Sequence, residues 1–258
     1  MRTVAVVLAA GSGSRFGSAS PKQLRVLAGH NLIQHSARAF DRAPGVDEVL
    51  VVASASILDQ VRQDLAGLGK IADVIAGGAS RSDSTRQALG WLSPRAPGDT
   101  KVLIHDAARP LVDQRIIADC VAALDRWQAI GVVVPSSDTI VEIASGTIQQ
   151  VLPRDGLARC QTPQGFRLAV ISRAYELADA DPGFATAQAT DDCGVVLRYL
   201  PGVAIGAVTG SERNLKITYA ADLGIAHALL APADDSCAPE PSSGRGQAAR
   251  TGQEADAP

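Results

Sequence analysis

The chain has 258 residues, of which 46% are hydrophobic and 20% charged, and its formal net charge at pH 7 is −3. These values are typical of a globular protein, and the slight negative charge argues against general binding to nucleic acid. No apolar run approaches the roughly 18 residues of a membrane-spanning helix, so we expect no membrane partner.

Apolar runs typical of strands alternate with stretches typical of helices along most of the chain. The predicted strands cover residues 4–8, 48–53, 72–76, 101–105, 131–135 and 203–208. The predicted helices cover residues 31–40, 57–68, 80–92, 114–129, 168–180 and 219–230. This alternation predicts an α/β fold, a mostly parallel sheet with helices on both faces, whose ligands bind beyond the carboxyl ends of the strands.

The first predicted strand runs directly into a loop that contains Gly11, Gly13, Arg15 and Lys22. Glycines allow backbone N–H groups to approach an anion closely, so this loop is suited to bind phosphate. The two cations favour a triphosphate over a single phosphate. A plain turn rich in glycine and serine would explain neither cation.

Two other glycine-rich phosphate loops do not fit this segment. The P-loop requires Gly-Lys followed by Ser or Thr, whereas Gly17 is followed by Ser18 and Ala19. The dinucleotide fingerprint requires a third glycine, where this chain has Phe16, and an acidic residue at the end of the second strand, which is missing. The loop instead resembles the signature of sugar-phosphate nucleotidyltransferases, L-A-A-G-x-G-x-R followed by P-K.

The segment His-Asp-Ala-Ala-Arg-Pro follows the predicted strand at residues 101–105. Asp106 ends a strand beside the phosphate loop and is well placed to hold Mg²⁺, which takes one or two carboxylates plus phosphate oxygens. Arg109 could clamp a second phosphate. The simpler alternative is an Asp–Arg pair that caps a turn, and we expect the neighbouring His105 to be structural.

Further candidate ligands each have a simple structural explanation as well. The glycine turn at residues 77–78 leads into a helix that Ser80 caps, so it could bind a base or a phosphate or only begin the helix. Lys216 could bind an anion or lie at the surface along its apolar stem. The hydroxyls of Thr162 and Thr190 suit a polyol or phosphate, although Thr190 could be only a helix cap.

Residues 138–152 interrupt the rhythm of strands and helices. Two β-branched runs flank Ala144-Ser145-Gly146, which predicts a β-hairpin. A two-stranded hairpin is marginally stable by itself, so we expect it to pack against something, and a second subunit is a good candidate.

The composition changes after residue 231. Residues 232–258 contain no aromatic residue and no Val or Ile, and are rich in Pro, Gly, Ser and Ala. Such a segment cannot bury enough apolar surface to order itself, so we predict a disordered C-terminal tail after a single domain of residues 1–231.

The cysteines and the N-terminus indicate the compartment. The four cysteines show neither metal-ligand spacing nor a C-x-x-C pair, and buried thiols are typical of a reducing cytosol. The chain enters a strand at once, which leaves no room for a signal peptide. We therefore expect a cytoplasmic protein.

Taken together, these segments resemble the 2-C-methyl-D-erythritol 4-phosphate cytidylyltransferase family over about residues 3–230. The motifs occur in the family's order: L-A-A-G-S-G-S-R, P-K-Q, G-G-x-x-R-x-D-S, H-D-A-A-R-P, D-T, T-P-Q, A-T-D-D and N-L-K-I-T. The resemblance implies transfer of CMP from CTP to a polyol phosphate with release of pyrophosphate, in the non-mevalonate isoprenoid pathway. It also implies a homodimer with a nucleotide-binding α/β fold, in which a β-arm at residues 138–154 completes the partner's site.

The resemblance assigns roles residue by residue. The CTP phosphate loop corresponds to Ala9, Ala10, Gly11 and Gly13, and the catalytic cations correspond to Arg15, Lys22 and Lys216. The cytidine contacts correspond to Gly78 and Ser84, and the residue between metal and polyol to Asp106. The polyol phosphate side corresponds to Arg109, Thr139, Thr162, Thr190 and the arm residue Arg154.

Two departures leave alternatives open. Ala79 stands where relatives often carry an acidic residue, which puts one cytidine contact in doubt. The segment at residues 190–196 is similar to that of relatives that act on pentitol phosphates such as D-ribitol 5-phosphate, whereas H-D-A-A-R-P favours the erythritol enzyme. Two non-catalytic hypotheses also remain, a nucleotide-binding regulatory module and a structural oligomerisation protein built around the hairpin.

Overall fold

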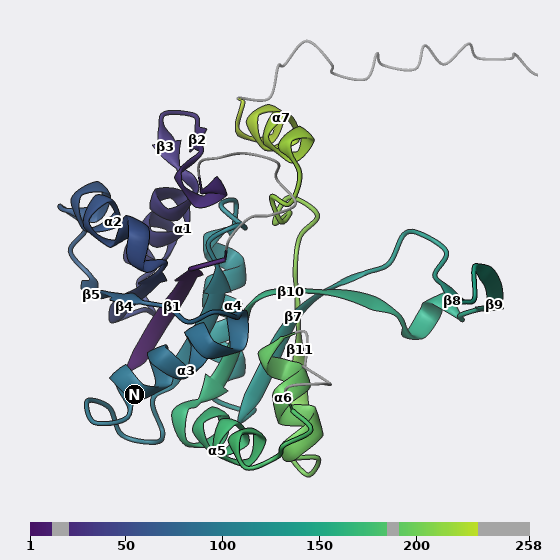
Figure 1. Ribbon diagram of the computed structural model, residues 1–258. Helices are drawn as coiled ribbons and strands as arrows, with labels where there is room; N and C mark the ends of the chain where they lie inside the picture. The colour runs from purple at the N-terminus through teal and green to yellow at the C-terminus, as the bar shows by residue number, and fades with distance from the viewer. Residues whose placement is uncertain (12–20, 185–190, 232–258) are drawn as a thin grey trace, which may run out of the picture.

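The computed structural model describes residues 1–11, 21–184 and 191–231, and a seven-stranded sheet forms its centre (Figure 1). The strand order is β11-β7-β10-β6-β1-β4-β5, and only β10 runs opposite to its neighbours. The strands are β1 (Thr3–Ala9), β4 (Glu48–Ala53), β5 (Ile71–Ala76), β6 (Lys101–Asp106), β7 (Ala129–Pro135), β10 (Ala158–Arg167) and β11 (Ile205–Thr209). The predicted α/β class with a mostly parallel sheet is confirmed.

Helices cover both faces of this sheet. They are α1 (Leu32–Asp41), α2 (Leu58–Leu65), α3 (Arg81–Leu92), α4 (Gln114–Ala123), α5 (Leu168–Asp179) and α6 (Asp192–Tyr199). A further helix, α7 (Ala220–Leu230), packs beside β2 instead, where Ala226 and Leu27 share a small apolar cluster. Short 3₁₀ turns lie at Lys22–Leu24, Ala55–Ile57 and Arg154–Gly156, and a small ladder joins β2 (Val26–Leu27) to β3 (His30–Asn31).

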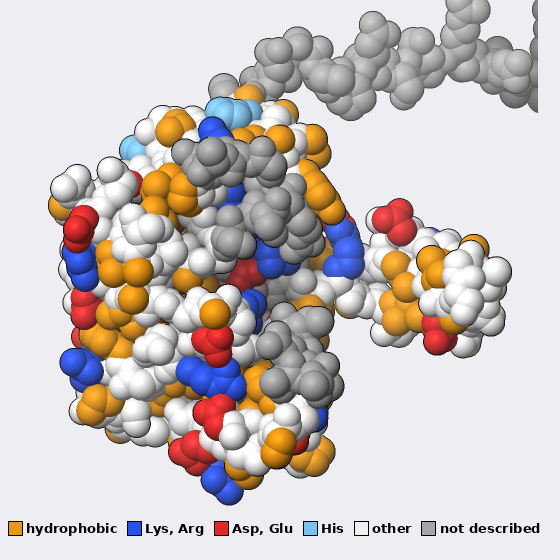
Figure 2. All heavy atoms as spheres, in the orientation of Figure 1, with side chains coloured by type: hydrophobic (Ala, Val, Ile, Leu, Met, Phe, Trp, Pro, Cys, Tyr) orange, Lys and Arg blue, Asp and Glu red, His pale blue; other side chains and the backbone are white. Residues whose placement is uncertain are grey.

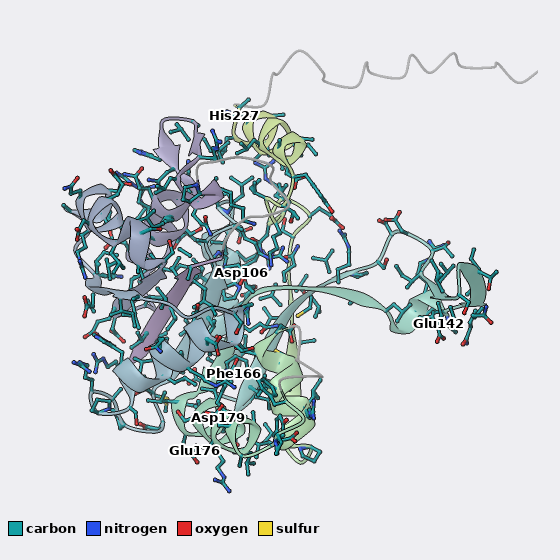
Figure 3. The ribbon with its side chains drawn as sticks, viewed as in Figure 1. Asp106, Glu142, Phe166, Glu176, Asp179 and His227 are labelled. Carbon is teal, nitrogen blue, oxygen red and sulfur yellow. The ribbon has the colours of Figure 1, made fainter. Side chains whose placement is uncertain are left out.

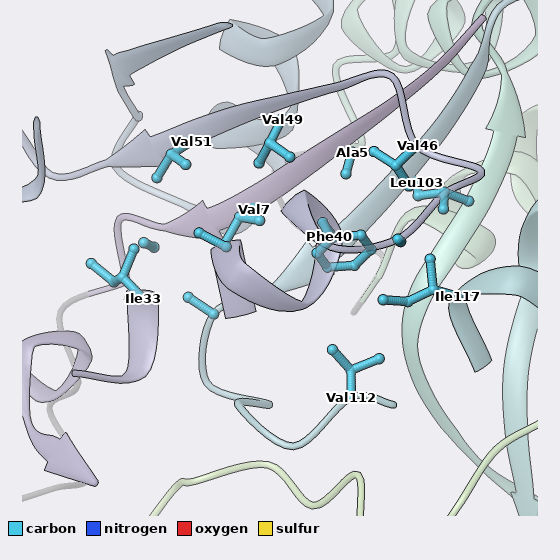
Figure 4. Packing of buried hydrophobic residues seen from close by; sticks show 14 of the residues in the cluster. Ala5, Val7, Ile33, Phe40, Val46, Val49, Val51, Leu103, Val112 and Ile117 are labelled. Carbon is cyan, nitrogen blue, oxygen red and sulfur yellow. The ribbon is translucent and has the colours of Figure 1, made fainter. Parts of the chain in front are cut away.

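The side chains of β1 alternate between two hydrophobic clusters. Ala5 and Val7 pack with α1, α2 and α4, where Phe40 fills the centre (Figure 4). Val4 and Val6 face the other way and pack with α3, α5 and α6. All residues of β1 are buried, as expected for a parallel strand that is covered on both faces.

Local sequence signals define the beginning of α3. The Ser80 hydroxyl accepts a hydrogen bond from the Asp83 N–H at 3.0 Å, and the Asp83 carboxylate accepts one from the Ser80 N–H at 3.0 Å. This reciprocal capping confirms the predicted N-cap. A Cβ at Gly78 would overlap Asp83, so this cap by itself requires glycine at that position.

Three secondary-structure predictions need correction. The segment around Thr162 was not among the predicted strands but lies in β10, which is rich in polar residues. The register of β10 against β7 shifts between Gln161 and Gln164, around Pro163, which has no N–H to donate. The predicted helix 114–129 ends at Ala123, because its last predicted residue begins β7. Residues 192–199 were not among the predicted helices, and they form α6.

The predicted hairpin is present as β8 (Val141–Ala144) and β9 (Thr147–Val151), and it projects away from the sheet (Figure 1). Ser145 and Gly146 form its turn with φ of 51° and 79°, the left-handed conformation that tight hairpins favour. Its apolar side chains Ile143, Ile148 and Val151 are 64%, 65% and 60% exposed.

The described helices include none that is long and apolar enough to cross a membrane. The predicted tail at residues 232–258 lies outside the described residues, so its expected disorder stays a prediction.

Candidate active site

Candidate residues from distant parts of the sequence converge where β1 and β6 end. Figure 2 shows Lys and Arg side chains gathered beside an acidic one at the middle of this face, and Figure 3 places Asp106 there. The ends of β1 and β6 lie side by side, since the N–H of Ala107, the first residue after β6, donates to the carbonyl of Leu8 in β1 at 2.9 Å. The site therefore lies at the carboxyl ends of parallel strands, as the sequence predicts.

Asp106, the last residue of β6, carries a carboxylate that is bound on both oxygens. Its Oδ1 accepts from Arg81 Nε at 3.2 Å and its Oδ2 from Lys216 Nζ at 2.7 Å. Burial alone would raise the pKa of this carboxyl, but the charges of Arg81 and Lys216 outweigh burial and hold the pKa far below its usual value. Asp106 is therefore an anion at neutral pH.

Arg81 is a site residue to which the sequence reasoning gave no role. Besides Asp106, it binds Asp192 at 2.7 Å between Nη1 and Oδ2, and Asp192 is completely buried. Burial opposes the charged form of Arg81, but Asp192 and Asp106 outweigh it and raise the pKa of the guanidinium. The arginine of the G-G-x-x-R-x-D-S motif was the available signal, but its partner Asp192 is 111 residues away.

Thr162 and His105 form a buried chain behind Asp106. His105 Nε2 lies 3.1 Å from the carbonyl oxygen of Arg109, so this nitrogen carries the proton and Nδ1 is an acceptor. The Thr162 hydroxyl then donates to Nδ1 at 3.0 Å and accepts from the Asp106 N–H at 3.1 Å. Burial lowers the pKa of His105 to about 4, which keeps its ring neutral. The hydroxyl of Thr162 is therefore already committed within the protein.

Arg109 bridges β10 and the segment that follows β11. It donates to the carbonyl oxygens of Asn214 at 2.8 Å and Cys160 at 3.3 Å. Its buried Nε has no hydrogen-bond partner among the described residues. Burial lowers the pKa of Arg109, while the charge of Asp106 acts in the opposite direction. The guanidinium thus lies near Asp106, as the sequence predicts.

Lys22 and Lys216 come from opposite ends of the chain and meet at this site. Lys22 Nζ donates to the carbonyl oxygen of Ile217 at 3.0 Å. The Ile217 N–H in turn donates to the carbonyl of Ala108 at 2.7 Å, which ties this segment to the end of β6. The structure therefore brings together two of the three predicted catalytic cations with Asp106.

The phosphate loop begins beside the glycine turn at residues 77–78. Ala9 is buried at the end of β1, and a Cβ on Gly77 would overlap both Ala10 and the Ser84 hydroxyl. Gly11 accepts a hydrogen bond from the side-chain amide of Gln23. The predicted ligands Gly13, Arg15 and Thr190 lie outside the described residues.

Ser84 uses its hydroxyl locally. It donates to the carbonyl of Ser80 at 3.0 Å and accepts from the Gly78 N–H at 3.3 Å. The cytidine contacts assigned to Gly78 and Ser84 stay predictions.

The structure does not bring Thr139 and Arg154 to the rest of the site within one chain. Arg154 donates to the Ser137 carbonyl at 3.2 Å and lies 3.5 Å from the Thr139 hydroxyl. Both residues lie next to the hairpin, whose Glu142 stands well away from Asp106 in Figure 3. Their contact with substrate stays a prediction.

Asp106 is the residue of this site that could hold a metal. The described part of the chain contains no group of three or more His, Cys, Asp or Glu that could hold a metal by itself. Mg²⁺ that arrives with a triphosphate needs only one or two protein carboxylates, because the phosphates supply further oxygens. A single buried carboxylate beside a phosphate loop fits that requirement.

A parallel α/β sheet whose strand ends gather a glycine loop, several cations and one ionised aspartate defines a nucleotidyltransferase. The model of the family IspD, 2-C-methyl-D-erythritol 4-phosphate cytidylyltransferase, matches residues 3–232. The chain belongs to this family.

Individual relatives of known name are similar to this chain over most of its length. The chain is 51% identical over 236 residues to the 2-C-methyl-D-erythritol 4-phosphate cytidylyltransferase of Thermobifida fusca, covering 89% of this chain and 93% of that protein. It is 36% identical to a bifunctional ribulose 5-phosphate reductase/CDP-ribitol pyrophosphorylase of Haemophilus influenzae, covering 89% of this chain but only 48% of that protein.

Solved structures give the same result. The 4-diphosphocytidyl-2C-methyl-D-erythritol synthase of Anaerococcus prevotii superposes with a TM-score of 0.76 at 26% identity, covering 89% of this chain and 98% of that one. The 2-C-methyl-D-erythritol 4-phosphate cytidylyltransferase of Francisella tularensis superposes with a TM-score of 0.75 at 26% identity, covering 89% and 100%.

Proposed function

We infer that the chain transfers CMP from CTP to 2-C-methyl-D-erythritol 4-phosphate. The products are 4-diphosphocytidyl-2-C-methyl-D-erythritol and pyrophosphate, and the reaction belongs to the synthesis of isoprenoid precursors. The observation that carries this conclusion is the 51% identity to a cytidylyltransferase of this name over 93% of its length. Arg81 and Lys216 pair with the Asp106 carboxylate, and Lys22 binds the carbonyl oxygen of Ile217, the residue after Lys216; these charges suit such chemistry.

The geometry supports direct transfer without a protein nucleophile. A phosphate oxygen of the acceptor attacks the α-phosphorus of CTP, and the bond from that phosphorus to the oxygen of the leaving pyrophosphate breaks. Catalysis then consists of positioning and of stabilising negative charge on phosphate oxygens. We assign this stabilisation to Lys22 and Lys216 from the structure and to Arg15 from the family motif.

We propose Mg²⁺ or another divalent cation as the cofactor and Asp106 as its ligand from this chain. The metal would neutralise phosphate charge when bound. Each oxygen of Asp106 is paired with one cation, so a bound metal would share an oxygen with that cation or replace it. The side chain of Lys216 is 40% exposed and that of Arg81 25%, so Lys216 is the partner with more freedom to leave.

We propose that the chain is a homodimer in which residues 138–154 reach the partner's site. The exposed isoleucines Ile143 and Ile148 support this arm, because a solvated two-stranded hairpin needs a surface to pack against. We also propose that Thr139 and Arg154 contact the acceptor phosphate bound by the partner subunit.

Mixed dimers test the arm. We expect Arg154→Ala and Lys22→Ala to be nearly inactive separately and to regain activity when their subunits are exchanged. One of the two sites in the mixed dimer then has both cations intact. Exchanged mixtures that stay inactive, while each parent is folded and dimeric, would show that Arg154 acts in its own subunit or has no role.

We propose one domain of residues 1–231 with a disordered tail at 232–258, and a cytoplasmic location. The composition of the tail supports the first proposal. The second is supported by the cysteines of the described residues, which are free thiols, two of them buried.

A second acceptor, D-ribitol 5-phosphate, is favoured by one observation. The Haemophilus influenzae relative is named as a CDP-ribitol pyrophosphorylase and is 36% identical over 89% of this chain. Pyrophosphate release should be measured with CTP and Mg²⁺ and with each acceptor in turn. The methylerythritol phosphate reaction should have the higher kcat/KM, and the reverse order would make this chain a pentitol phosphate enzyme.

A further inference from the structure

Arg81 lies between two carboxylates that belong to different elements. It is the first residue of α3, and its guanidinium reaches Asp106 at the end of β6 and Asp192 at the start of α6. The contacts use different nitrogens, Nε for Asp106 at 3.2 Å and Nη1 for Asp192 at 2.7 Å. The proposed reaction requires Asp106 but gives no role to Asp192.

Asp192 is held rigidly. Its side chain is completely buried, and Oδ1 accepts from the Thr85 hydroxyl at 3.0 Å and the Tyr175 hydroxyl at 2.7 Å. Its backbone N–H donates to the side-chain oxygen of Gln164 at 3.1 Å. A buried carboxylate is costly unless a cation pairs with it, and Arg81 is that cation.

The planar guanidinium of Arg81 couples the fixed position of Asp192 to Asp106. Its nitrogens lie in one plane with fixed spacing, so a contact that fixes Nη1 also restricts Nε. Nε lies against Oδ1 of Asp106, while Oδ2 faces the more exposed Lys216. The two oxygens of Asp106 are therefore not equivalent. Oδ1 accepts from Arg81, which Asp192 holds in place, and Oδ2 accepts from the more exposed Lys216.

We propose that Asp192 is a positioning residue of the reaction, which acts on Asp106 through Arg81. It holds the guanidinium on Oδ1 and thereby presents Oδ2 to Lys216 and to the divalent cation bound with CTP. This inference rests on the proposed function and adds a residue to its machinery. It also assigns the second aspartate of the A-T-D-D motif a task that does not require contact with substrate.

A double-mutant cycle of Asp192→Asn and Arg81→Gln tests the inference. We expect Asp192→Asn to lower kcat by about 10- to 100-fold, the usual effect of losing the partner of a ligand, and to weaken calorimetric binding of Mg²⁺ and CTP added together. In the Arg81→Gln background, the same substitution should change kcat less than about twofold, because its route to Asp106 is already absent. The double variant also removes the buried charges as a pair, which preserves folding.

Tyr175→Phe is the matched control. It removes a hydrogen bond from Oδ1 of Asp192 but leaves the Oδ2 contact with Arg81 intact. We expect it to lower the melting temperature while kcat and the binding of Mg²⁺ with CTP stay near wild type.

A purely structural Asp192 would give a different pattern. The melting temperature would fall in Asp192→Asn with kcat unchanged, or the losses of kcat in the two single variants would multiply in the double variant. Either outcome overturns the proposal, whereas a wild-type enzyme without pyrophosphate release would overturn the proposed function itself.

Discussion

Acidification should destabilise this protein through His105 before most of its carboxylates begin to titrate. The ring is completely buried, packs edge-on against Phe40 at 5.1 Å between centroids, and donates one hydrogen bond while it accepts another. No site remains for a second proton without loss of the bond from Thr162. The folded protein therefore resists protonation of His105, whereas the unfolded chain does not.

The sign and size follow from the pKa of His105, which burial lowers from 6.5 to about 4. Between these values the unfolded state binds the proton and the folded state does not, so the free energy of unfolding decreases as pH falls. The contribution of neutral His105 to the free energy of unfolding is fully present above pH 6.5 and is lost as pH approaches 4. The shift corresponds to about 3 kcal/mol over the whole window. His35 has a lowered pKa for the same reason, so it adds to the loss.

Urea unfolding between about pH 7.5 and pH 4.5 measures this slope. His105→Gln should be less stable than wild type at neutral pH, but its free energy of unfolding should depend much less on pH in this range. His35→Gln controls for the other histidine and should keep most of the slope. If His105→Gln retains the full wild-type slope, the ring of His105 is not the group that resists protonation.

The remaining predictions concern the site and the tail. Lys216→Gln should lower kcat by about 10²- to 10³-fold. The control Arg198→Gln removes the 2.8 Å ion pair with Asp181 and should leave kcat unchanged. Equal kcat values of the two variants would contradict the catalytic role of Lys216. Thr162→Ser should keep activity and melting temperature, and Thr162→Val should lower both, because only serine retains the hydroxyl between His105 and Asp106. Deletion of residues 232–258 should change neither, and a large fall in melting temperature would show that the segment docks.

Most of the sheet could be predicted because its parallel strands are buried on both faces and read as continuous apolar runs. The predicted bounds of β4 agree with the structure, and those of β1 differ by one residue at each end. β10 could not be found in this way, since Gln161, Thr162 and Gln164 are buried in it. These side chains tolerate burial because partners bind them: Asn214 donates to the Gln161 side chain, and Thr162 donates to His105. No local sequence pattern reveals such partners from another part of the chain.

Those parts of the site that consist of single charged residues near strand ends could be predicted from the sequence. Asp106 and Lys216 carry the charges that a triphosphate site needs, and their motifs placed them beside β6 and after β11. The arm was predictable as a hairpin, because its two runs flank a turn with a glycine. Whether its residues contact substrate depends on a second copy, which the sequence of one chain does not describe.

Arg81 escaped prediction for a reason that also explains its role. A cation is recognised from sequence when it adds charge to a loop, as Lys22 does, but Arg81 lies in the first turn of a helix where any polar residue is acceptable. Its importance comes from the pair of anions that meet it in space. Of the two cations on Asp106, arginine can be shared between two carboxylates in fixed geometry, whereas lysine is a point charge on a flexible stem. This difference supports the proposed roles, in which Arg81 holds Asp106 in place and Lys216 remains free to follow the reacting phosphates.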